Sequence, residues 1–173
     1  MQLENMYQEI ILDHYRNPHH KGLRDPYDAE VFHVNPTCGD EVRLRVSLKG
    51  GDGASAGEAG AGEAGEPVVE DVSYESLGCS ISQASASVMS DLVIGKPLSE
   101  AMRIGDAFLE LMQSKGQLEP DEDVLEDAVA FAGVSKYPAR IKCALLGWMA
   151  WKDATARALA HTDEGSDSDG GNS

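Results

Sequence analysis

Apolar and polar residues alternate strictly between residues 42 and 48, and this pattern limits the possible folds more than any other feature. The apolar positions are Val42, Leu44, Val46 and Leu48, separated by Arg43, Arg45 and Ser47. Successive side chains of a strand point to opposite faces of a sheet, so the alternation predicts a strand with one buried face. The segments "EVFHV", from Glu30, and "VVEDVSYESLG", from Val68, are also strand-like. With "NPTCGD" as the first connection, the three segments predict a small antiparallel sheet.

Helical spacing replaces alternation in the second half of the chain. "CSISQASASVMSDLVIG" carries apolar residues at intervals of three and four, and Gly95 followed by Pro97 predicts its end. We expect Ser99 to cap a helix over "EAMRIGDAFLELMQSKG", a short acidic helix over "DEDVLEDAVAFAG", and a long helix from Pro138. Another helix is expected over residues 2–16. Strands grouped before most of the helices predict an α+β domain, with helices on one face of a three-stranded sheet.

Two segments of low complexity interrupt or end this pattern. Residues 50–66, "GGDGASAGEAGAGEAGE", are rich in Gly and Ala and show no periodicity, so we expect a flexible loop inserted between two strands. Residues 161–173, "HTDEGSDSDGGNS", are expected to form a disordered acidic tail. The predicted organisation is one domain over residues 1–160, with the loop at 50–66 as an insertion.

The charge balance excludes some classes of function. The chain has 30 acidic residues against 14 Lys and Arg, giving a net charge of −16, which repels the phosphates of nucleic acids. No apolar run is long enough to span a membrane. The first residues, "MQLENMYQEIILDHYRNP", lack the basic start and cleavage site of a signal peptide, so we expect a cytoplasmic protein.

Three cysteines, Cys38, Cys79 and Cys143, lie far apart in the sequence. An odd number in a reducing compartment favours free thiols, metal ligands or a nucleophile over disulfides. Each is expected near the end of an element, and a helix N-terminus favours the thiolate form that binds metal. With Asp40, the thiols would supply the four donors that zinc prefers.

Other interpretations of these residues remain open at this point. A buried cysteine is often only a small apolar residue, and an aspartate in a turn often serves the turn itself. The spacing contains no C-x-x-C pair, so it supports a metal site only weakly. The five histidines lack the helical spacing of metal ligands, and we expect them at the surface or in loops.

Four motifs in order resemble one protein family. "ILDHYRNPHHKG", "NPTCGDEVRL", "GCSISQASASVM" and "YPARIKCALLGW" are similar to the SufU proteins, which are related to the IscU scaffold and to the NifU N-terminal domain. The resemblance covers Met1 to about Ala160, apart from the loop at 50–66. It implies an IscU-like α+β fold with zinc held by Cys38, Asp40, Cys79 and Cys143.

The resemblance also implies a role. SufU proteins accept sulfur from the persulfide of a SufS-type cysteine desulfurase, and the acceptor here would be Cys38, with Arg140 assisting the anionic sulfur or the docking. IscU-type scaffolds have a histidine where this chain has Lys142, and they lack the segment "GQLEPDEDVLEDAVAFAGVSKY". The implied function is a zinc-dependent sulfurtransferase that supplies a downstream iron–sulfur scaffold. The alternatives are a scaffold on which the same ligands hold a [2Fe–2S] cluster, and a purely structural zinc module.

Overall fold

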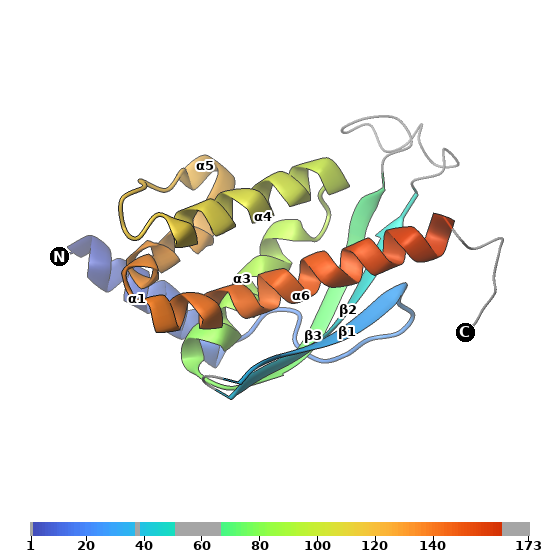
Figure 1. Cartoon of the computed structure of the whole chain (residues 1–173), viewed down its shortest axis with the longest axis horizontal. Coiled ribbons are helices and arrows are strands. Elements are labelled where there is room, and N and C mark those ends of the chain that lie inside the picture. The colour runs from blue at the N-terminus through green and yellow to red at the C-terminus, as the bar shows by residue number, and fades with distance from the viewer. Residues whose placement is uncertain (1, 37–38, 51–66, 164–173) are drawn as a thin grey trace.

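The structure, a computed structural model of the 173-residue chain, describes residues 2–36, 39–50 and 67–163. Cys38, most of the predicted loop at 50–66 and the last ten residues of the predicted tail lie outside the described residues. Figure 1 shows the order of the elements along the chain. They are α1 (Gln2–Arg16), β1 (Ala29–Asn35), β2 (Asp40–Lys49), β3 (Val68–Leu77), α3 (Ser80–Val93), α4 (Leu98–Gln113), α5 (Glu122–Leu125), the 3-10 helix η1 (Glu126–Lys136) and α6 (Pro138–Asp163).

The three strands form the antiparallel meander that the alternation predicted, in the order β1-β2-β3. In its register Leu44 of β2 lies between Val31 of β1 and Tyr74 of β3, and all three side chains are buried. On the opposite face Phe32 and Arg43 are exposed. One face of the sheet therefore carries the core and the other faces solvent.

The helices cover the apolar face. In Figure 1, α6 runs along the sheet, and it packs on β1, β2 and α3. Helix α3 also contacts α1, and helix α4 contacts η1. Trp148 of α6 stacks on Phe108 of α4 with ring centroids 4.5 Å apart, which joins the sheet-facing helix to the outer helices. This arrangement confirms the α+β class with helices on one side. No described helix is long and apolar enough to cross a membrane.

Two predicted helix details are wrong. Helix α4 begins at Leu98 and not with a cap at Ser99, because the N–H of Leu98 donates to the carbonyl of Pro67, 2.8 Å away, and so has its partner in the chain before β3. The acidic helix is shorter than expected: α5 ends at Leu125, since Glu126 has a φ of 47°, and the chain continues as η1.

A buried hydroxyl joins α3 to α6. Ser85 donates to the carbonyl of Ala144 at 2.6 Å and accepts from the indole N–H of Trp148 at 3.0 Å, and its side chain is fully buried. Both partners lie on α6: Ala144 directly follows Cys143, and Trp148 is one turn further along the helix. This contact therefore fixes α6, which carries Cys143, against α3, which begins directly after Cys79.

We expect Ser85→Ala to lower the free energy of unfolding by about 1–3 kcal/mol, because it leaves a buried indole N–H and a carbonyl without this partner. In a Trp148→Phe background the same change should cost less, since the indole N–H is then absent. Urea denaturation of the four proteins measures this coupling. Equal costs in both backgrounds would show that the hydroxyl does not act through the indole.

Candidate metal centre

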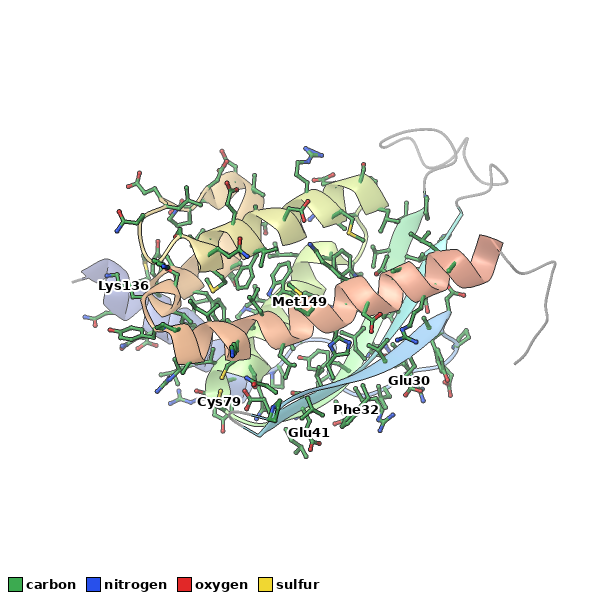
Figure 2. All side chains as sticks on the ribbon, in the orientation of Figure 1. Glu30, Phe32, Glu41, Cys79, Lys136 and Met149 are labelled. Carbon is green, nitrogen blue, oxygen red and sulfur yellow. The ribbon has the colours of Figure 1, made fainter. Side chains whose placement is uncertain are left out.

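Three of the predicted ligands meet at one end of the sheet. Asp40 is the first residue of β2, Cys79 lies between β3 and α3, and Cys143 is in the second turn of α6. Their ligand atoms all lie within 4.8 Å of one another. In Figure 2, Cys79 lies at the end of the sheet nearest to the first turns of α6. Residues separated by more than 100 positions are thus brought together by strand pairing and by the packing of α6.

The carboxylate of Asp40 is the most buried part of this site, with 0% of the residue exposed. Oδ1 accepts from the backbone N–H of Cys79 at 2.9 Å, and Oδ2 accepts from the Cys79 thiol at 3.7 Å. Neither donor carries a positive charge. Because a buried carboxylate is costly without a charged partner, this environment suits a cation held between the carboxylate and the thiols.

Gly78 makes the approach of Asp40 to Cys79 possible. Its φ is +136°, and a Cβ added to it would lie 2.1 Å from Oδ1 of Asp40. The side chain of any other residue would therefore occupy the space that the carboxylate fills. Sequence reasoning did not identify Gly78, because the requirement comes from Asp40, 38 positions earlier in the chain.

The two cysteines that the structure describes, Cys79 and Cys143, differ in their surroundings. Cys79 is the N-cap of α3 and is half-buried. Cys143 was expected at a helix start, but it is the sixth residue of α6, 2% exposed, and its thiol donates to the carbonyl of Ala139 at 3.7 Å. Helix α6 does begin at Pro138 as predicted.

Arg140 lies in the first turn of α6, exposed and three residues before Cys143. Residues three apart lie on the same side of a helix, so Arg140 and Cys143 share a face of α6. Arg140 also lines a cavity of about 690 Å³ between α1, η1 and the start of α6, together with Ile81 and Tyr137. Lys142 is exposed as well. The two predicted cationic residues are thus exposed and lie in the first turns of α6, close to Cys143 in sequence.

The histidines were expected at the surface, and for His14 this is wrong. His14 is 2% exposed, and its ring is hydrogen bonded to Ser87 and Asp127. It forms a second group of potential metal ligands with His19 and Asp91. Sequence spacing could not reveal this group, because the third member comes from α3, more than 70 positions away.

Comparisons with known proteins identify the family. The family model of the NifU-like N terminal domain matches residues 6–144. The chain is 40% identical to the zinc-dependent sulfurtransferase SufU of Bacillus subtilis, over 90% of this chain and 92% of that one. It is 38% identical to the iron–sulfur cluster assembly scaffold protein IscU of Streptococcus pyogenes, over 90% of this chain and 86% of that one.

A solved structure gives the same result for the fold. A candidate iron–sulfur cluster assembly scaffold protein of the SUF system from Fervidobacterium islandicum superposes with a TM-score of 0.66 and 32% identity, covering 84% of this chain and 93% of that one. The four motifs, the meander with its covering helices and these likenesses agree. The chain therefore belongs to the family of the NifU-like N-terminal domain, with the IscU-like fold that the SufU resemblance implied.

Proposed function

We propose that this protein is a zinc-dependent sulfurtransferase that accepts persulfide sulfur from a SufS-type cysteine desulfurase and passes it towards iron–sulfur cluster assembly on a separate scaffold. The observation that carries the proposal is the meeting of Asp40, Cys79 and Cys143 within 4.8 Å at a buried site. The name of the Bacillus subtilis relative supports the same function. The functional unit is residues 1–160, and the protein acts in the cytoplasm.

The donors present fit zinc. Zinc binds thiolates and carboxylates in four-coordinate sites, and the fully buried carboxylate faces two thiols. Cys38 would complete the set: it is two residues before Asp40, so covalent geometry alone keeps its Cα within about 8 Å of the Cα of Asp40. When bound, zinc would keep these thiols deprotonated and tie together three distant segments.

The sulfur transfer itself is an exchange between sulfur atoms. The thiolate of Cys38 attacks the outer sulfur of the desulfurase persulfide, a new S–S bond forms, and the old one breaks. The cysteine thiolate of the desulfurase leaves, so the step needs no oxidant or reductant. Arg140 and Lys142, which are exposed and close to Cys143 in sequence, would offset the charge of the anionic sulfur as it arrives.

The settings of the other two cysteines support the assignment of Cys38 as the acceptor. Cys143 is 2% exposed within α6, and the backbone of Cys79 is bonded to Asp40, so neither can move towards a docked enzyme. Exposed apolar residues surround this end of the molecule: Val34 and Leu77 at the strand ends, and Tyr137 just before α6. They provide a surface on which the desulfurase can dock close to Cys38.

The second candidate function is a scaffold that holds a [2Fe–2S] cluster on the same ligands. The likeness to the Streptococcus pyogenes scaffold favours it, and three thiolates suit such a cluster. The lysine at position 142, where IscU-type scaffolds carry a histidine, favours the sulfurtransferase. Visible absorption and metal analysis of the anaerobically purified protein separate the two.

We expect the native protein to hold one zinc at the cysteine site, counted as the difference in zinc content from Cys143→Ser. Removing this zinc with a chelator should lower the melting temperature by about 5 °C or more, because the ligands come from separate segments. An unchanged melting temperature after verified loss of zinc would contradict a stabilising site, and equal zinc content in both proteins would contradict the site itself.

Cys38→Ser should abolish persulfide formation on this protein and its stimulation of the desulfurase. Asp40→Ala removes a ligand but keeps the nucleophile, so it should weaken zinc binding and leave Cys38 open to oxidation. Mass spectrometry with peptide mapping, after incubation with a SufS-type desulfurase and cysteine, locates the added sulfur. Persulfide on Cys79 or Cys143, with Cys38 unmodified, would overturn the assignment.

Gly78→Ala should weaken zinc binding at least about tenfold, because the added methyl group displaces the carboxylate of Asp40. Gly95→Ala is a matched control: Gly95 also has a positive φ, +86°, but an added Cβ meets nothing within 4 Å. Competition with a chromophoric chelator measures the affinity of both variants. If both bind zinc equally well, Gly78 serves only the backbone conformation.

A further inference from the structure

A second group of potential ligands lies at the other end of α3. His14, His19 and Asp91 offer ligand atoms that all lie within 4.8 Å of one another. Asp91 is 12 residues after Cys79 along α3, which corresponds to about 18 Å at the rise of an α-helix. The group is therefore separate from the cysteine site and shares no residue with it.

Two histidines converge on one carboxylate at this place. Nδ1 of His19 contacts Oδ2 of Asp91, and Nε2 of His20 lies 3.0 Å from Oδ1 of the same side chain. The side chains of His19 and Asp91 are 42% and 38% exposed, so ions in solution can reach them. His20 has a φ of 64°, a strained conformation for a residue other than glycine, and it is held in place by the surrounding contacts.

His14 supplies a third, pre-oriented ring. Its Nε2–H donates to Asp127 at 3.0 Å, while Nδ1 accepts from the hydroxyl of Ser87 at 2.7 Å. Ser87 is on α3 one turn before Asp91, so Nδ1 is the nitrogen that faces the carboxylate. A histidine that donates one ring N–H to a carboxylate and directs the other nitrogen to a metal is the usual arrangement in metal sites.

The loop that carries His19 is fixed by buried groups. The backbone N–H of His19 donates to the hydroxyl of Ser87 at 2.8 Å, and the backbone carbonyl of His19 accepts from the hydroxyl of Tyr74 at 2.9 Å. Burial raises the pKa of Tyr74 well above its usual value, so the phenol keeps its proton and remains a donor at every physiological pH. The rings of His14 and His19 lie 4.6 Å apart between centroids. The geometry of the group is thus built in by α1, α3 and β3.

We propose that His14, His19 and Asp91 bind a divalent first-row transition metal ion of the Fe²⁺ and Zn²⁺ class. Two imidazoles and one carboxylate are the donors that this class prefers, and they leave positions for water. His20 orients Asp91 through its second oxygen, and Asp127 orients His14, so the ligands have their own supporting contacts. The metal would replace the contact between His19 and Asp91 and the hydrogen bond between Ser87 and Nδ1 of His14.

The alternative is a hydrogen-bond network that only fastens the loop to α3. The same contacts would exist in both cases, so only metal binding distinguishes them. The experiment uses the full-length chain without a histidine tag, first loaded with one equivalent of zinc and dialysed. Zn²⁺, and in a separate anaerobic arm Fe²⁺, is then titrated in, and bound metal is measured by equilibrium dialysis with elemental analysis.

The test variant is H19Q/D91N, in which both changes are at partly exposed positions. The matched control is H33Q/D153N: His33 and Asp153 form a similar pair, 2.9 Å apart and similarly exposed, but neither is in a described ligand group. We expect the wild type and the control to bind one equivalent more than H19Q/D91N, or to bind it at least about tenfold more tightly.

Equal binding by the wild type and H19Q/D91N with both metals would overturn the proposal. Binding of Zn²⁺ but not Fe²⁺, or the reverse, supports the site and identifies its metal. Because only the difference between variant and control is counted, the result does not depend on the cysteine site. Circular dichroism of all three proteins verifies that they are equally folded, and a metal-dependent rise in melting temperature that only H19Q/D91N lacks is a second supporting result.

Discussion

The buried carboxylate of Asp40 and the backbone N–H of Cys79 form the interaction on which the cysteine site depends. It joins the start of β2 to the start of α3, at the point where β3 ends. The strand register brings the two residues to the same end of the sheet, since Glu41 pairs with Leu77. Helix α6 then closes the site from above with Cys143. The start of β2, the connection before α3 and helix α6 therefore contribute one donor each.

A different part of the fold holds each of the three donors in place. Cys79 is held by its own backbone, Cys143 by the interior of α6, and Asp40 by the end of a strand. Rigid elements hold donors more precisely than loops do, because packing fixes their rotamers. Cys38 lies outside the described residues, and the proposed chemistry assigns the moving role to it.

Sequence periodicity predicted the strands and most of the helices, and the family resemblance implied the residues of the cysteine site. Alternation from Val42 to Leu48 predicted β2, and Cys79 and Cys143 were expected where the structure has them, apart from the one extra turn before Cys143. Features that depend on tertiary partners could not be predicted. The start of α4 depends on a carbonyl at Pro67, the need for Gly78 on Asp40, and the burial of His14 on Ser87 and Asp127.

The outer edge of β3 has a further consequence. Lys21 forms a parallel bridge with Tyr74, the N–H of Gly22 donates to the carbonyl of Tyr74, and the N–H of Arg24 donates to the hydroxyl of Ser73. The carbonyl of Tyr74, which another chain would need for strand addition in the middle of this edge, is thus already occupied. Copies can pair into a continuous sheet only if both edges of each sheet are open. By covering the edge of β3, the segment between α1 and β1 therefore protects the protein against edge-to-edge aggregation.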